Sequence, residues 1–198
     1  DVTKFADLWV PVRPGTDAAF LLACIHVILK EYYVDRQVPY FRDYVKKYTN
    51  LPFLVMLEPQ EDETYLKGRF VRASDVGGYE DEELADWKLL MMDRWSGDFR
   101  LPGGSVGFRW ETGQTGRWNL KSEDVKTGAA FDPLLSFLEA QDTPHEEVRV
   151  RFADFTDTFD TSLGKTEGKG RPARTLIRGV PARRVRTKNG EVLVTTAF

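Results

Sequence analysis

The stretch "WVPVRPGTDAAFLLACIHVILKEYY", from Trp9 to Tyr33, decides how the N-terminal part of this chain folds. It predicts a short strand at 7–12, a Pro-Gly-Thr turn and a helix over 17–33. Thr16 is a good N-cap residue, and the helix dipole favours an acid at Asp17 by about 0.3–1 kcal/mol. Because the helix is apolar on almost every side, we expect it to be buried among neighbours.

The residues that follow complete an alternation of strands and helices. The spacing of the tyrosines predicts a second helix over 39–48, and the run "FLVML" at 53–57 is typical of a parallel strand covered on both faces. Strand, helix, helix, strand is the order of a βαβ unit. We therefore assign the chain to the α/β class, with residues 1–58 as the N-terminal part of a Rossmann-like cofactor-binding domain.

Strand patterns dominate from residue 59 to residue 198, which we interpret as a β-rich mixed insertion with a scaffold role. One short helix is predicted at "DPLLSFLEAQ" (132–141), and Asn189-Gly190 is a strong hairpin signal. The Gly/Lys/Arg-rich stretch at 164–172 is predicted to be a loop. The predicted strands are "YLKGRFVRA" (65–73), "WKLLMMD" (87–93), "DFRL" (98–101), "SVGFRW" (105–110), "EVRVRF" (147–152), "ARRVRT" (182–187) and "EVLVTTAF" (191–198).

Composition argues against several classes of partner. The net charge of the 198 residues is -3, which gives no overall attraction to nucleic acid or to an acidic membrane surface. The span 165–188 is strongly basic, yet it contains no aromatic residue on which a base could stack, so we expect no nucleic-acid binding. An acidic neighbour such as the span 58–86 is the simpler partner for it.

The residues that could hold a metal are few and badly placed. Cys24 is the single cysteine, and His26 lies two positions away on the predicted helix, so the two side chains point in different directions. His145 lies in an acidic loop and is expected to be solvated. The sequence therefore predicts no metal ligands and no catalytic residues within this chain.

The turn before the first helix has two interpretations. Its residues form a common helix start, and that alone explains the acid at Asp17. Alternatively, the turn lies where α/β sheets bind nucleotides, and the Asp17 carboxylate accepts hydrogen bonds from a base. Guanine fits best, because its adjacent N1–H and N2–H donors can be accepted by one carboxylate.

A resemblance adds weight to the second interpretation. The stretch beginning "FADLWVPVRPGTDAAF" is similar to the turn that holds one guanosine of the bis-molybdopterin guanine dinucleotide in molybdopterin oxidoreductases. Together with "YFRDYVKKYTNLPFLVMLE", "GSVGFRW", "GRWNL" and "LVTTAF", it resembles the α (catalytic) subunit of respiratory membrane-bound nitrate reductases. The resemblance implies that Gly15, Thr16 and Asp17 belong to the guanosine pocket, with Arg13 beside it.

The same resemblance implies the setting of the whole enzyme. It would reduce nitrate to nitrite at a molybdenum bis-dinucleotide with a 4Fe-4S centre, beside a β subunit with iron-sulfur centres and a membrane γ subunit that oxidises quinol. It would lie on the cytoplasmic side, peripheral to the inner face of the membrane. The molybdenum and iron-sulfur ligands would lie upstream of Asp1. We therefore expect an internal fragment that alone binds no cofactor, is inactive and self-associates.

Two alternatives stay open at this point. The chain could belong to another molybdopterin oxidoreductase, of the formate or selenate type, because none of its residues identifies the substrate. It could also be a non-enzymatic guanine-nucleotide-binding or interaction module whose turn only resembles the family.

Overall fold

The computed structural model describes residues 4–104, 120–139, 144–156 and 175–198. The predicted strand at 105–110 and the predicted loop at 164–172 lie outside these residues. The chain divides into two compact units, Asp1–Tyr44 and Val45–Phe198. The predicted boundary at residue 58 stays a prediction about the longer protein.

The first unit is helical. Its helix α1 (Asp17–Leu29) begins where the sequence predicts, but at Lys30 the backbone widens into the π-helical turn η2 (Lys30–Asp35). Two ion pairs join residues five positions apart: Lys30 with Asp35 at 2.6 Å and Glu31 with Arg36 at 3.0 Å. A turn that closes at i+5 brings such residues together, which accounts for the change of helix type. Helix α2 (Pro39–Tyr48) has the predicted bounds.

The strand predicted at 7–12 is absent from the part of the chain that the structure describes, where residues 7–8 form a bend and residues 9–12 have no regular secondary structure. A strand needs a neighbour to satisfy its backbone hydrogen bonds. Among the described residues, no strand pairs with this segment. The predicted Rossmann-like sheet is therefore not observed in the described part of this unit. The observed architecture is therefore a helical unit followed by a unit rich in strands.

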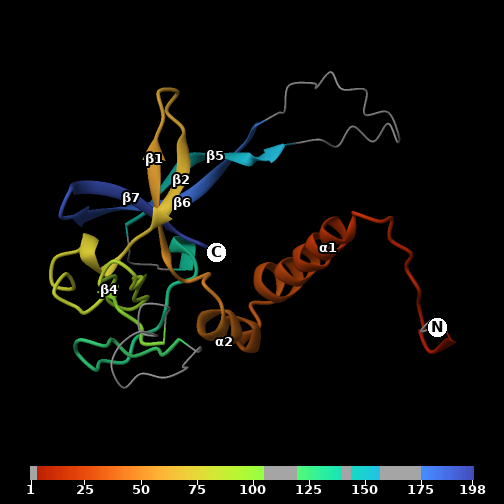
Figure 1. Ribbon diagram of the computed structural model, residues 1–198, viewed down its shortest axis with the longest axis horizontal. Helices are drawn as coiled ribbons and strands as arrows, with labels where there is room; N and C mark the ends of the chain where they lie inside the picture. The colour runs from red at the N-terminus through yellow and green to blue at the C-terminus, as the bar shows by residue number, and fades with distance from the viewer. Residues whose placement is uncertain (1–3, 105–119, 140–143, 157–174) are drawn as a thin grey trace. The chain divides into compact units, whose positions relative to one another are not determined.

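The second unit is built on a closed five-stranded barrel with strand order β1-β2-β5-β6-β7 (Figure 1). Strands β2 and β5 run parallel, and the other four junctions are antiparallel, including β7 with β1. Closure gives each of these five strands a neighbour on both sides, although β2 and β5 pair over only two residues each. The strands are β1 (Leu54–Pro59), β2 (Tyr65–Phe70), β5 (Glu146–Thr156), β6 (Thr175–Thr187) and β7 (Gly190–Thr196).

The direction predicted for β1 is wrong. Both of its neighbours, β2 and β7, are antiparallel to it. The apolar run did report burial correctly, since Leu54 and Leu57 are both buried. Burial of a strand does not determine its direction, which depends on partners elsewhere in the chain.

The hairpin between β6 and β7 confirms the Asn189-Gly190 signal. Thr187 pairs with Gly190 across the turn, and its hydroxyl donates to the Gly190 carbonyl at 2.8 Å. Gly190 has φ +112°, a backbone conformation that favours glycine.

Loops, short strands and 3-10 turns pack against the barrel within this unit. They include η3 (Ala73–Asp75), β3 (Met91–Met92), β4 (Phe99–Arg100) and η5 (Phe137–Glu139). The helix predicted at 132–141 is wrong over its described residues, where η5 is the helical turn. Pro133 bridges to Asp93 and the Leu134 N–H donates to the Met92 carbonyl, so this backbone pairs with another segment instead of with itself.

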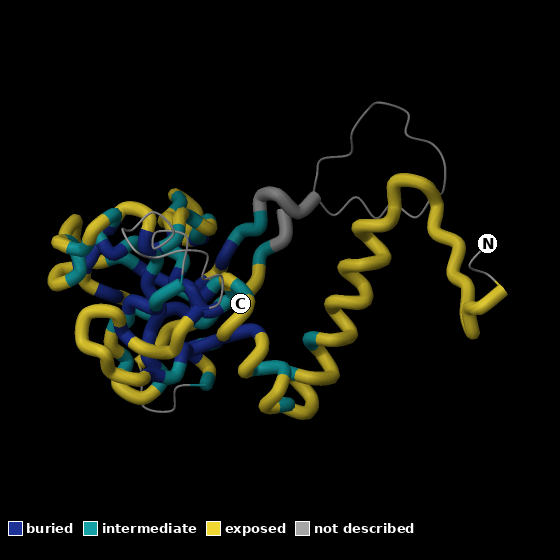
Figure 2. The backbone as a smooth tube through the Cα atoms, turned by 60° about the horizontal axis from the view of Figure 1, so that its bottom comes forward, coloured by how far each residue is buried: buried dark blue, intermediate teal, exposed yellow. Residues whose placement is uncertain are grey.

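Burial is concentrated in the second unit, where the dark blue segments of Figure 2 gather. The main cluster joins barrel residues such as Leu54 and Val194 to loop residues such as Leu90, Leu101 and Phe137, all of them 0% exposed. The loops and the barrel therefore share one apolar core.

Candidate functional site

The turn that precedes α1 is held by its own backbone and by Thr16. Gly15 has φ +85°, which a residue with a side chain rarely adopts. The Thr16 N–H donates to the Arg13 carbonyl at 3.0 Å, and the Thr16 hydroxyl donates to the same oxygen at 2.7 Å. Thr16 therefore occupies the N-cap position, but its hydroxyl closes the turn and does not cap the helix.

The start of α1 is consequently open toward solvent. The first intrahelical bond at this end runs from the Phe20 N–H to the Thr16 carbonyl at 3.2 Å, so the three N–H groups before it receive no acceptor from the helix. Asp17 is the first helical residue and is exposed. A Cβ built on Gly15 would meet no atom within 4 Å, so the surface over the turn is clear.

This donor and acceptor set suits a guanosine nucleotide. The Asp17 carboxylate can accept two hydrogen bonds from the Watson-Crick edge of guanine. The N–H groups at the helix start and the Arg13 guanidinium both favour a phosphate. The structure thus places all four sequence-predicted residues, Arg13, Gly15, Thr16 and Asp17, within one exposed turn.

Helix α1 presents apolar side chains all round, and none of its residues is buried in this chain. The sequence predicts a buried helix, and this burial is not observed within the helical unit. Cys24 and His26 are both exposed, and the described residues contain no group of three or more potential metal ligands. Among those residues, no helix combines the length and apolarity that a bilayer crossing requires. The exposed apolar residues of α1 include Phe20, Leu21, Leu22, Ile25, Val27 and Ile28.

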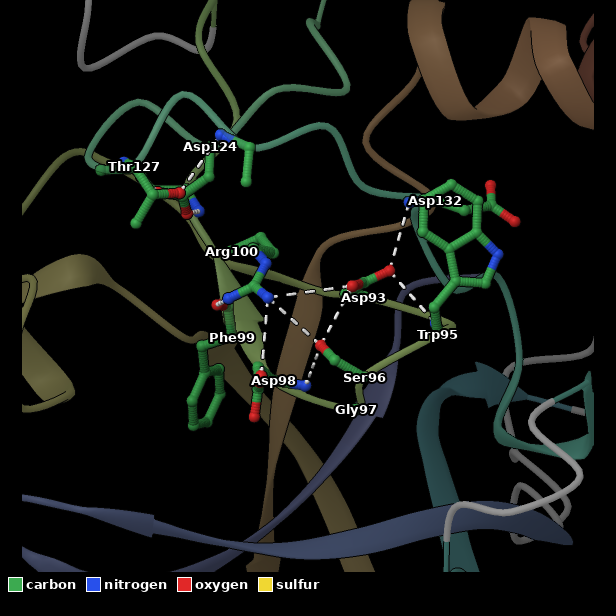
Figure 3. A network of polar contacts seen from close by, with 12 residues as sticks. Asp93, Trp95, Ser96, Gly97, Asp98, Phe99, Arg100, Asp124, Thr127 and Asp132 are labelled. Carbon is green, nitrogen blue, oxygen red and sulfur yellow. Dashed lines mark hydrogen bonds and ion pairs between the residues drawn. The ribbon is translucent and has the colours of Figure 1, made fainter.

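A network of polar contacts organises the β3–β4 turn in the second unit (Figure 3). The buried Asp93 carboxylate accepts from the Trp95 N–H at 3.1 Å, the Ser96 hydroxyl at 3.0 Å and the Asp132 N–H at 3.2 Å. Arg100 Nη2 lies 3.9 Å from the same carboxylate. A buried charge with this many donors is satisfied, so the network is structural.

Asp124 forms a second satisfied hub, with 1% of its surface exposed. One carboxylate oxygen accepts from the Tyr79 hydroxyl at 2.8 Å and the Leu101 N–H at 2.9 Å, and the other accepts from Lys126 and Thr127. Burial acts to raise the pKa of Asp124, but the hydrogen bond from Leu101 and those from Tyr79 and Thr127 outweigh it and hold the pKa below its ordinary value. Burial, reinforced by Asp124, raises the pKa of Tyr79.

Acidic and basic segments also meet within this unit, as the sequence suggests. Lys188, at the end of the basic span, lies 3.8 Å from Glu80. Arg151, which lies outside the basic span, pairs with Asp62. These contacts use carboxylates of the acidic span 58–86 inside the chain.

Sequence reasoning missed both carboxylate hubs. The "DRWSGD" stretch at 93–98 carries an Asp, Ser and Gly turn signal that identifies a turn, but the donors from Asp132 lie too far along the chain to be inferred. Both carboxylates are already occupied by backbone and side-chain donors of their own loops, which is typical of structural hubs, so the exposed turn at Arg13–Asp17 is the candidate site.

Comparison with known proteins gives a consistent result. No family model matches the chain. Over its whole length the chain is 38% identical to the respiratory nitrate reductase 1 alpha chain of Escherichia coli, of which it covers 15%. It is 39% identical, also over its whole length, to the nitrate reductase alpha subunit of Mycobacterium tuberculosis, of which it covers 14%.

A shorter match reaches a differently named enzyme. Over 34% of the chain, it is 43% identical to a sulfite dehydrogenase subunit of Allochromatium vinosum, of which it covers 6%. The two matches to nitrate reductases carry more weight than this shorter one, because they extend over the whole of this chain and so include both the helical unit and the barrel. Over its whole length the chain is therefore similar in sequence to nitrate reductase alpha chains, and it spans about 15% of the length of those relatives.

Proposed function

We propose that this chain is a segment of the catalytic α subunit of a respiratory nitrate reductase, and that its Arg13–Asp17 turn holds a guanosine of the molybdenum cofactor. The observation that carries the proposal is the similarity to nitrate reductase alpha chains over the whole chain. The open, exposed turn at the start of α1 supports the second part, because it offers the groups that a guanine nucleotide needs.

Each residue of the turn has a distinct role in this proposal. Asp17 accepts the N1–H and N2–H bonds of guanine and orients the base. Arg13 balances the charge of the neighbouring phosphates. Gly15 leaves room for the nucleotide to approach the backbone, and Thr16 fixes the turn through its two bonds to the Arg13 carbonyl.

The bis-molybdopterin guanine dinucleotide, when bound, supplies the redox chemistry that converts nitrate to nitrite. This chain's residues bind and orient one end of it. The helical residues before β1 then act as part of the cofactor-binding domain that the sequence predicts over 1–58, and the barrel with its loops acts as the scaffold around it. Electrons would arrive through 4Fe-4S centres, those of a β subunit among them, from a membrane γ subunit, with the enzyme on the cytoplasmic face of the membrane.

The assignment of nitrate as the substrate rests on the similarity to nitrate reductase alpha chains and not on a contact made by a residue of this chain. The match to a sulfite dehydrogenase subunit favours a second candidate, in which the same scaffold serves a molybdenum enzyme with another oxyanion substrate. Assay of both oxyanions with the full-length protein separates the two.

The test of the turn is a pair of substitutions in the full-length α subunit. Asp17→Asn keeps the size of the side chain but places an amide donor against the donor edge of guanine, which costs about 2–4 kcal/mol by leaving buried donors unpaired. We expect guanine and molybdenum content per mole of purified protein to fall.

Thr16→Ala is the matched control at the neighbouring position. It removes the hydroxyl bond to the Arg13 carbonyl, which costs about 1 kcal/mol of local stability, and it keeps the backbone bond that closes the turn and the Asp17 carboxylate. Cofactor content should therefore stay close to that of the unmodified protein. If Asp17→Asn kept its full guanine and molybdenum content while Thr16→Ala lost it, the proposed role of Asp17 would be refuted. Asp17 would then serve only as a favourable charge at the start of the helix.

A further inference from the structure

Trp95 has a large apolar side chain that is exposed to solvent. Its relative exposure is 71%, although it lies at the tip of the β3–β4 turn beside a tightly packed core. The described residues give its ring no aromatic stacking or cation contact, and its backbone N–H is the group that bonds inside the chain.

Hydrogen bonds hold the backbone of the turn that carries Trp95 (Figure 3). Asp93 is 4% exposed and accepts hydrogen bonds from Trp95, Ser96 and Asp132. The Gly97 N–H donates to the Asp93 carbonyl at 2.8 Å, and Gly97 adopts φ +70°. The backbone position from which the indole projects is therefore set before any partner arrives.

The neighbouring residue extends the rigid support. The Arg94 N–H donates to the Asp132 carbonyl at 2.8 Å, and its guanidinium lies 3.6 Å from the Asp132 carboxylate. Lys46 pairs with the other oxygen of that carboxylate and is itself buried. The exposed Trp95 therefore sits on a turn tied to Lys46 and to the segment at 132–134.

A preorganised, exposed tryptophan has the physical properties of an interface anchor. It buries a large apolar area with few torsions to order, and preorganisation removes much of the cost of association. Trp and Arg are the residues most enriched among energetically dominant interface positions. The described residues hold the backbone of this turn but give the Trp95 ring no stacking or cation partner.

We propose that Trp95 is the anchor of an interface with the remainder of the same α polypeptide, where an apolar pocket receives the indole. This proposal rests on the assignment of the chain to a nitrate reductase α subunit. The chain spans 15% of the length of such a relative, so most of that polypeptide is available to supply the pocket.

Hydroxyl-radical footprinting of the wild-type protein tests the proposal without risk of misfolding. Oxidation of the Trp95 peptide is measured by mass spectrometry in the isolated chain, in the separate full-length α polypeptide and in the complete enzyme, with a reporter peptide for radical dose. Trp95 should oxidise about tenfold more slowly in the separate α polypeptide than in the isolated chain, since the core of an interface excludes water. Met92, at 1% exposure, should be equally protected in all three samples.

Each other outcome overturns the proposal. Equal oxidation of Trp95 in all three samples would show that no interface covers it. Protection that occurs only in the complete enzyme would assign the pocket to a partner subunit and refute the intramolecular one. Nitrate reduction, measured on the same samples, reports on the proposed function separately, because an active enzyme with an exposed Trp95 rejects only the interface.

Discussion

At the residue scale, Asp17 and Asp124 differ in exposure: the Asp17 carboxylate is open to solvent, whereas the Asp124 carboxylate is buried among its donors. Asp17 is defined by its immediate neighbours, the turn before it and the helix after it, so its place and its exposed carboxylate follow from local sequence. Asp124 is defined by donors from Tyr79 and Leu101, which lie 45 and 23 positions away. No periodicity in the sequence reports contacts of that length, and the hub could be found only in the folded chain.

Asp124→Asn should strongly destabilise the second unit. Whichever oxygen the amide group replaces, an NH2 donor then faces buried N–H or O–H donors, and each unpaired donor costs about 1–3 kcal/mol. We expect the free energy of unfolding, measured by urea denaturation of the chain, to fall by about 2–4 kcal/mol. The matched control is Asp98→Asn, whose exposed side chain makes a 3.5 Å pair and should change it by less than about 0.5 kcal/mol.

The same aspartate predicts a dependence of stability on pH. Because the pKa of Asp124 is lowered in the folded chain, it contributes stability above the unfolded pKa of about 3.9 and loses that contribution as pH falls through the folded value. The difference in unfolding free energy between wild type and Asp124→Asn should therefore shrink below about pH 4. A difference that stays constant from neutral pH into that range would contradict the charged role of Asp124.

At the element scale, local signals succeed and long-range pairings fail. The bounds of α2 and the hairpin at Asn189-Gly190 are set by residues within a few positions, and both are confirmed. The direction of β1 depends on β7, at the other end of the chain, and the predicted helix at 132–141 yields to hydrogen bonds with the segment at 92–94. The burial of β1 and of the segment at 132–139 could be predicted from their apolar residues, but the segments with which they pair could not.

Helix α1 carries a prediction of its own. Its exposed apolar residues include Leu21, Leu22, Ile25 and Val27, and monomers seldom leave such a contiguous apolar surface in water. We expect the isolated chain to self-associate and to bind a hydrophobic dye, as measured by light scattering and dye fluorescence across a concentration series.

A double substitution separates this helix from other causes of association. Leu22→Gln with Val27→Gln removes two exposed apolar side chains without emptying any packed position, and it should shift the chain toward monomer. A strictly monomeric wild-type chain at high concentration, with no dye binding, would contradict the prediction.

At the scale of the whole molecule, the chain combines a barrel with its own core and a helical unit whose apolar residues remain exposed. The strand-rich class of residues 59–198 could be predicted from the sequence because each strand carries its own pattern. Closure of the barrel could not, because it depends on pairing of β1 with β7. The incomplete burial of α1 agrees with a chain that spans 15% of its relatives' length.

The most direct test of the proposed function is the activity and cofactor content of the full-length protein beside those of this chain. Both are purified and assayed with reduced viologen for conversion of nitrate to nitrite, and molybdenum, iron and guanine are quantified per mole. The account predicts that the full-length protein reduces nitrate and carries molybdenum with guanine, whereas the isolated chain does neither, because it has one thiol and two histidines as potential soft ligands. A full-length protein that lacks molybdenum and guanine, or nitrate turnover by the isolated chain, would contradict it.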